Sequence, residues 1–111
     1  MIGTHYSNDF NCAHFVAKWY EKNLCIKIPV IDEFEISFVR WMRKHFQEIK
    51  KPENNCLVLM YKSGSNHVGI YSDYGVYHNY KAGKAHGSVV HWTMGVVARN
   101  YQKVTYWKWL Q

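Results

Sequence analysis

The chain has 111 residues with a formal net charge of +6, and 48% of them are hydrophobic and 17% aromatic. This length leaves room for a single folded domain, residues 1–111, and this apolar content excludes an intrinsically disordered chain. There is no run of about 18 apolar residues, so we expect no membrane span. The excess of positive charge favours acidic partners, such as cell-wall polymers, nucleic acid or anionic lipid.

The first residues give an expectation about location. Residues 1–9 contain no basic stretch followed by an apolar core and a small-residue cleavage site, which together mark a secretory signal. We therefore expect no signal peptide and synthesis in the cytoplasm. An extracytoplasmic target then has to be reached by another route.

The sequence predicts a helix over residues 11–23. Ser7, Asn8 and Asp9 can accept hydrogen bonds from its free amides, and Cys12 falls in its first turn. Apolar residues at helical spacing predict one buried face, which contains Phe15, Val16, Trp19 and Tyr20.

A second helix is predicted over residues 34–49, where apolar side chains again form one stripe. Positive residues gather in and just after it, and they have two interpretations: they keep the outer face of the helix solvated, or they bind an acidic polymer. These residues are Arg40, Arg43, Lys44, Lys50 and Lys51.

From residue 57 onward the composition changes to short β-rich runs separated by Gly, Ser, Asn and Asp. The predicted strands are 57–61, 67–71, 76–80, 89–92 and 104–109. Helices followed by an antiparallel sheet define the α+β class. We therefore expect N-terminal helices packed on a small antiparallel β-sheet.

The three cysteines, Cys12, Cys25 and Cys56, are odd in number and widely spaced. This pattern indicates neither a disulfide framework nor a Cys-x-x-Cys metal or redox site. Cys25 and Cys56 stand among apolar residues, where a free cysteine acts as a small buried hydrophobe. Cys12 differs, because the amides and dipole at a helix start stabilise a thiolate.

A cysteine nucleophile also needs a base. His67 opens one predicted strand and His78 lies on the next, and an antiparallel hairpin around residues 72–75 brings the two close, so one imidazole can orient the other. A zinc site made by these histidines and Cys12 is disfavoured, because the sequence lacks close ligand pairs. Solvated or structural roles are expected for His5, His86 and His91.

Three short motifs are similar to those of the NlpC/P60 family of cysteine peptidases. Residues 11–16, Asn-Cys-Ala-His-Phe-Val, resemble the nucleophile motif of that family at the head of a helix. Residues 67–71, His-Val-Gly-Ile-Tyr, match its base-bearing strand, and residues 76–78, Val-Tyr-His, resemble the strand that supplies its third polar group. The resemblance covers residues 6–80, and it implies a papain-like fold with Cys12 as nucleophile, His67 as base and His78 as the orienting group.

The resemblance also implies a substrate and a setting. Members of this family cleave peptide bonds of peptidoglycan stem peptides, often next to D-glutamate, and they need no cofactor. Lys27-Ile28-Pro29 resembles a short link found in bacteriophage-type members. This implies a phage-associated hydrolase that is carried in the virion or delivered to the cell wall, with phage tail proteins as partners.

Two residues depart from the family pattern beside the nucleophile. Asn11 stands where the family has Asp, and His14 stands where many members have Gly. The resemblance implies that Asn11 lies at the substrate cleft, and that at His14 either the cleft is shaped differently or this side chain lines it. It also implies that the Cys12 amide and Tyr6 stabilise the oxyanion of the reaction.

Two non-catalytic alternatives stay open. The fold can serve as a tail-assembly or cell-wall-binding module without catalysis. A basic, aromatic chain can also bind nucleic acid by stacking bases on its tryptophans. We rank this last and expect no nucleic-acid partner, because core packing explains the periodic positions of Trp41, Trp92, Trp107 and Trp109.

We predict that iodoacetamide at neutral pH labels Cys12 well before Cys25 and Cys56, because only Cys12 is expected at a helix start beside a base. Peptide mass spectrometry after short exposures of the folded protein measures the three labelling rates. Equal labelling of all three cysteines would contradict this assignment.

Overall fold

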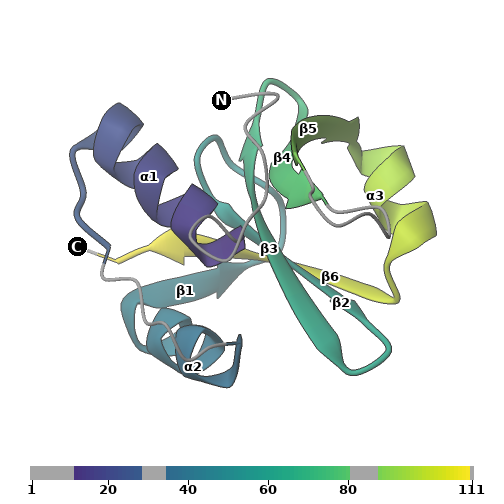
Figure 1. Ribbon diagram of the computed structural model, residues 1–111, viewed down its shortest axis with the longest axis horizontal. Coiled ribbons are helices and arrows are strands. Elements are labelled where there is room, and N and C mark those ends of the chain that lie inside the picture. The colour runs from purple at the N-terminus through teal and green to yellow at the C-terminus, as the bar shows by residue number, and fades with distance from the viewer. Residues whose placement is uncertain (1–11, 29–34, 81–87, 111) are drawn as a thin grey trace.

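A six-stranded antiparallel sheet organises the part of the chain that the structure describes (Figure 1). The computed structural model describes residues 12–28, 35–80 and 88–110, and it describes side chains for 15–28, 39–80 and 88–110. The strand order is β1-β6-β2-β3-β4-β5, so the last strand lies between the first two. In chain order the elements are α1 (Cys12–Leu24), α2 (Glu35–His45), β1 (Phe46–Ile49), β2 (Leu57–Lys62), β3 (Ser65–Ser72), β4 (Gly75–Tyr80), β5 (Ser88–Thr93), α3 (Met94–Asn100) and β6 (Lys103–Trp109).

The expected papain-like fold, with N-terminal helices on a small sheet, is wrong. The six strands contain more of the described residues than the helices do, and α3 follows β5 instead of belonging to an N-terminal helical layer. α3 begins where the Thr93 side chain accepts a hydrogen bond from the Val96 amide, a cap that the strand pattern concealed.

The second helix is also shorter than predicted, since it ends at His45. The next four residues form β1, in which Phe46 pairs with Trp109 and Ile49 pairs with Tyr106 of β6. The partner strand begins more than 50 residues later in the chain. The helical spacing of apolar residues in this segment therefore cannot show where the helix ends and the strand begins.

Both faces of the sheet are covered, which explains the uninterrupted apolar run in β2. Successive side chains of a strand point to opposite faces. Leu57 and Leu59 join the core beneath α1, whereas Val58 and Met60 join a second core with Val97 of α3. These four of the six β2 side chains are buried, and each contributes about 2 kcal/mol through loss of contact with water. α1 and α3 flank the strands on either side in Figure 1.

α1 is fixed to the sheet by the loop before β2. The indole Nε1–H of Trp19 donates to Oδ1 of Asn55 at 3.1 Å, and the Tyr20 hydroxyl donates to the Asn55 carbonyl. The Trp19 ring also lies 5.1 Å from the Tyr77 ring of β4. The helix that starts at Cys12 is thus held against β3 and β4.

α2 is held at the other edge by an aromatic group. The Phe46 and Trp109 rings meet edge to face at 5.1 Å, and Trp41 of α2 lies 6.0 Å from Phe46 and 6.3 Å from Trp109. Such ring contacts add to the stability from burial alone. They join the end of α2 to the β1-β6 edge of the sheet.

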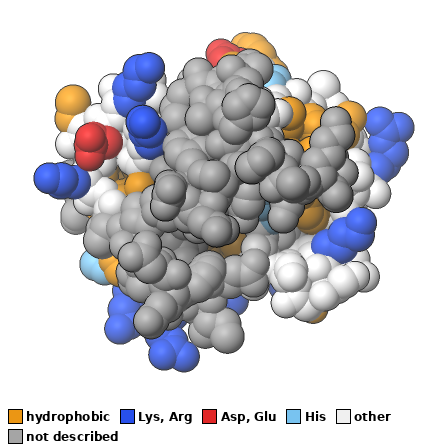
Figure 2. Space-filling view, viewed as in Figure 1, with side chains coloured by type: hydrophobic (Ala, Val, Ile, Leu, Met, Phe, Trp, Pro, Cys, Tyr) orange, Lys and Arg blue, Asp and Glu red, His pale blue; other side chains and the backbone are white. Residues whose placement is uncertain are grey.

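The positive side chains that are visible on one face of the molecule are not gathered in one place (Figure 2). Figure 2 shows Lys and Arg side chains at several separate places around one face of the molecule, without a single large patch among the coloured atoms. None of the helices within the described ranges is long and apolar enough to cross a membrane.

β3 and β4 approach each other closely at Gly69, which pairs with His78. A methyl group at position 69 would lie 2.7 Å from Cγ1 of Val76, 2.8 Å from the Tyr77 carbonyl oxygen and 3.0 Å from Cβ of His78. Atoms cannot pack at the first two distances without displacement of the strand. Glycine at this position therefore determines how closely the two strands lie.

We predict that Gly69→Ala lowers the free energy of unfolding by about 2 kcal/mol, because the new methyl group overpacks the β3-β4 contact. Urea denaturation followed by circular dichroism measures the change. Gly95→Ala is the matched control, since a methyl group there comes no closer than 3.9 Å to Oγ1 of Thr93. Because Gly95 lies in α3, its replacement should stabilise the protein by about 0.5 kcal/mol. Equal effects of the two changes would rule out steric crowding at Gly69.

Candidate active site

The hairpin that carries the two candidate histidines turns tightly. Ser72 pairs with Gly75, and the two residues between them, Asp73 and Tyr74, have φ of 54° and 61°. Two consecutive positive φ values match a two-residue hairpin turn whose twist suits antiparallel strands. The predicted antiparallel pairing of these strands is confirmed.

This pairing brings His67 and His78 into contact. Nε2 of His67 lies 3.0 Å from Nδ1 of His78, with the rings 77° apart in a T-shaped arrangement. Gly69, which pairs with His78, presents no side chain between the two imidazoles. The hydrogen bond therefore depends on the same close approach of β3 and β4.

The contact lies where the sheet divides. The β3-β4 ladder ends at the pair Gly69 and His78. Beyond it, residues 65–68 stay paired with β2, and residues 79–80 stay paired with β5. Beside His67, β3 and β4 are therefore no longer paired with each other. The β3-β4 ladder does not separate the two faces of the sheet at this point.

Aromatic rings surround the histidine pair. Trp92 of β5 lies 4.5 Å from the His78 ring at 79°, and Tyr80 lies 5.8 Å from it. Tyr101 stacks on His67 at 6.2 Å and 10°. The predicted site does not include these aromatic residues. Tyr80 could have been found from the sequence, because residues two apart on a strand share a face and Tyr80 follows His78 at this spacing. Trp92 and Tyr101 could not, because the strand order and the position of α3 place them beside the histidines.

Burial keeps both imidazoles neutral. Loss of hydration lowers the pKa of His67 to about 4. The pKa of His78 is lowered to about 3, first by burial and then by the charges that His67 and His91 would carry. Near pH 7 each ring therefore has one N–H and one lone pair, so one ring donates and the other accepts in the 3.0 Å contact.

The direction of that hydrogen bond decides whether His67 can act as a base. If Nε2–H of His67 donates, its Nδ1 keeps a free lone pair that can take a proton. If Nδ1–H of His78 donates, Nδ1 of His67 carries the proton and cannot accept another. Within the described residues, Nε2 of His78 is buried without a hydrogen-bond partner in either case.

The remaining predicted site residues are only partly covered by the structure. α1 does begin at Cys12 and contacts β3 and β4, but the side chains of Cys12 and His14 lie outside the described part. Tyr6 and Asn11 lie wholly outside the described residues. The structure thus brings together His67 and His78 among the predicted residues.

The helix that begins at Cys12 and the two histidines belong to different sides of the sheet. α1 packs over Val68 and Ile70 of β3, so alternation turns His67 and His78 toward the α3 face. The β3-β4 ladder that separates these two sides ends at the pair Gly69 and His78, so it does not extend to His67.

The other two cysteines behave differently from each other. Cys56 is buried, as predicted, and burial raises the pKa of its thiol. The expectation that Cys25 is buried is wrong, because it is exposed. Cys25 follows the last residue of α1 with φ of 55°, and this left-handed conformation turns the chain away from the helix. The labelling test is therefore decided by Cys12 against Cys25.

His91 has the structural role expected for it. Its Nε2–H donates to the Ser72 carbonyl at 3.0 Å, and its ring lies 4.3 Å from Tyr77. The ring also covers Gly75, where an added methyl group would approach it to 2.7 Å. In the described part of the chain, no group of three or more His, Cys, Asp or Glu side chains is arranged to hold a metal ion.

Comparison with known proteins adds no family to these observations. No protein-family model matches the chain, and no curated protein matches it. The similarity of residues 11–16, 67–71 and 76–78 to NlpC/P60 motifs therefore stays a prediction from the sequence.

We predict that the free energy of unfolding decreases by about 2 kcal/mol as the pH falls from 6.5 toward 4. The folded-state pKa of each imidazole lies below its unfolded value, so the unfolded chain binds more protons in this interval. The stability that the two neutral imidazoles contribute is fully present above pH 6.5 and is lost as the solution becomes more acidic. Urea denaturation at a series of pH values measures it.

His67→Gln is the control for this pH dependence, since glutamine does not titrate and the slope of stability against pH should become smaller. Nitrogen NMR of the imidazoles gives a second measurement, because the shifts identify which ring nitrogen carries hydrogen. A parent slope equal to that of His67→Gln would show that the pKa of His67 is not lowered by folding.

Proposed function

We propose that this chain is a cysteine peptidase or amidase, with Cys12 as nucleophile, His67 as general base and His78 as the group that orients His67. The observation that carries the proposal is the 3.0 Å contact between Nε2 of His67 and Nδ1 of His78 at the end of the β3-β4 ladder. When Nε2–H of His67 is the donor in this contact, Nδ1 of His67 keeps a lone pair that can accept the proton of a thiol. A base held by a second polar group is the arrangement that activates cysteine nucleophiles.

The chemistry follows from these positions. Nδ1 of His67 takes the thiol proton, and Sγ of Cys12 attacks the carbonyl carbon of the scissile amide. The resulting imidazolium then gives this proton to the leaving amine, and a thioester remains on Cys12. Water adds to the thioester with His67 again as base, which releases the carboxylic acid and restores the thiol.

Two features support proton transfer despite the low pKa of His67. The imidazolium forms beside the thiolate, and the attraction between the two charges offsets the cost of burying one of them. The Nε2–H of this imidazolium also donates to Nδ1 of His78, and that hydrogen bond strengthens as positive charge develops on His67. The free amides at the start of α1, including that of Cys12, are suited to hold the oxyanion.

The substrate class is proposed from the sequence motifs. Because residues 11–16, 67–71 and 76–78 resemble NlpC/P60 motifs, peptidoglycan stem peptide is the substrate to test first. A bacteriophage-associated role, with delivery to the cell wall, belongs to the same proposal. The formal net charge of +6 is compatible with an acidic wall polymer as the surrounding matrix.

We predict an order of activities among variants, measured as release of peptide fragments from purified peptidoglycan by mass spectrometry. Cys12→Ser and His67→Ala should lose nearly all turnover, about 1,000-fold or more, because each removes a reacting group. His78→Asn should keep part of the rate, since its amide oxygen can still accept the N–H of His67. His78→Ala should retain less.

Cys25→Ser is the matched control, because Cys25 is an exposed cysteine at the opposite end of α1, and its activity should equal that of the parent. Circular dichroism checks that each variant is folded. Wild-type rates in Cys12→Ser, or no fragment released by the parent from peptidoglycan, would refute the hydrolase and favour a non-catalytic wall-binding module.

A further inference from the structure

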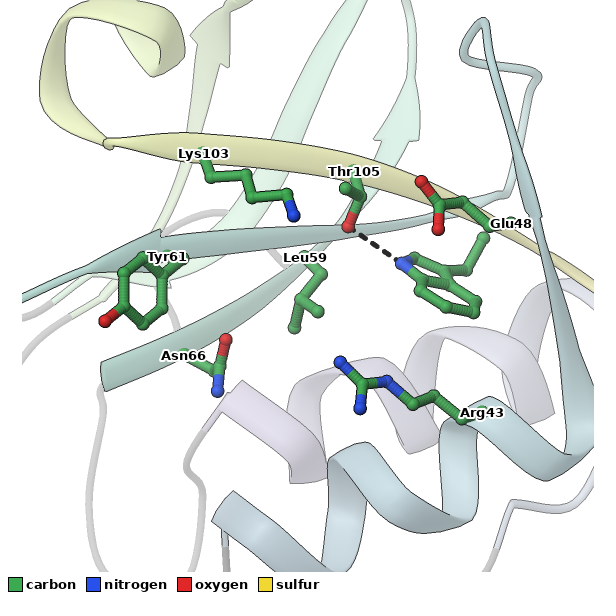
Figure 3. Close-up of a pocket in the computed structure, with 8 residues that line it drawn as sticks. Arg43, Glu48, Leu59, Tyr61, Asn66, Lys103 and Thr105 are labelled. Carbon is green, nitrogen blue, oxygen red and sulfur yellow. Dashed lines mark hydrogen bonds between the residues drawn. The ribbon is translucent and has the colours of Figure 1, made fainter. Parts of the chain in front are cut away.

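A cavity separate from the histidine pair lies next to α2, on the face of the sheet that α1 also covers. It has a volume of about 520 Å³, which is within the usual range for small-molecule sites. Side chains from α2, β1, β2, β3 and β6 line it (Figure 3). The lining residues are Arg43, Glu48, Leu59, Tyr61, Asn66, Lys103, Thr105 and Trp107.

Strand register builds the floor of this cavity. Tyr61 pairs with both Lys103 and Asn66, so these three side chains form one row across β6, β2 and β3. Leu59 pairs with Thr105 in the next row. A third row follows, in which Trp107 pairs with Glu48. The floor is therefore rigid, because neighbouring residues are hydrogen-bonded in a sheet.

Two aromatic rings offer flat surfaces to a ligand. The indole Nε1–H of Trp107 donates to Oγ1 of Thr105 at 2.9 Å, which fixes the direction of the ring before any ligand enters. Tyr61 is 38% exposed, so its ring is accessible to a ligand. Rings of this kind contact the apolar face of a ligand while polar neighbours bind its edge.

The charges of the cavity point to a ligand with one anionic group. Arg43 reaches from the last turn of α2 toward the strands, and Lys103 and Glu48 lie on the facing wall (Figure 3). All three side chains are exposed, and none has an ion pair with another described residue. Two cations attract an anion, whereas the single carboxylate disfavours a polyanion and accepts hydrogen bonds from hydroxyl groups.

We propose that this cavity binds an acidic saccharide, a sugar that carries one carboxylate or phosphate group. Trp107 and Tyr61 lie two rows apart, so neighbouring sugar rings of the saccharide lie against them. The anionic group pairs with Arg43 and Lys103, and the hydroxyls meet Glu48, Asn66 and Thr105. This goes beyond the proposed hydrolase, and it does not depend on the thiol chemistry. Asn66 points to the α2 side of β3 and His67 to the other side, so the two sites are distinct.

The test follows the Trp107 indole N–H by nitrogen-edited NMR of the full chain during titration with an aldobiouronic acid, a disaccharide of one glucuronic acid and one neutral sugar that carries a single carboxylate. Trp107→Phe identifies this resonance among those of the five tryptophans. The resonance should shift with a saturating curve, and Arg43→Gln and Lys103→Gln should each weaken binding about fivefold. Maltose, a neutral disaccharide, should bind more weakly than the acidic probe by a similar factor.

Arg40→Gln is the matched control, since it removes the same charge from an exposed position of α2 that does not line the cavity, and it should leave the affinity unchanged. Glucose 6-phosphate distinguishes a phosphate from a carboxylate as the anionic group, and binding of either acidic sugar supports the proposal. A probe response that is equal in Arg40→Gln and Arg43→Gln would overturn it. So would the absence of any shift with both acidic sugars, or a shift with adenosine monophosphate alone.

Discussion

The arrangement of this protein depends on the close approach of β3 and β4 at Gly69. Without a side chain at this position, the strand comes within contact distance of Val76, Tyr77 and His78, where a methyl group would not fit. This approach lets the two imidazoles hydrogen-bond. Where the ladder ends, the strands separate beside His67. Glycine at position 69 thus links the packing of the sheet to the geometry of the candidate site.

The histidine pair is a polar group kept inside an aromatic surrounding. Burial lowers the pKa of each ring, so the pair remains neutral, and the contact between them satisfies one nitrogen of each. An apolar surrounding of this kind costs stability whenever a proton is added. The same surrounding strengthens the attraction between an imidazolium and a thiolate, because fewer waters screen the charges. The low pKa and the proposed role of His67 therefore have one physical origin.

The sheet carries two different chemical surfaces. His67 and His78 face the α3 side, while Arg43, Lys103 and the Trp107 ring meet on the side of α2. The basic residues around α2 had two interpretations in the sequence, a solvated face or a binding surface. The structure divides them: Arg40, Arg43 and Lys44 are all exposed, but of the three only Arg43 lines this cavity.

The sequence by itself determined the helix at Cys12, the strands from residue 57 onward and the hairpin that joins His67 to His78, because these depend on local periodicity and turn residues. The tertiary structure decided the rest. Phe46–Ile49 became a strand, β6 entered between β1 and β2, and Cys25 became exposed. The pairings that build the cavity from Arg43 and Lys103 join residues far apart in the chain. Local sequence cannot specify them, because the free energy that selects a strand's partner comes from burying both faces of the completed sheet.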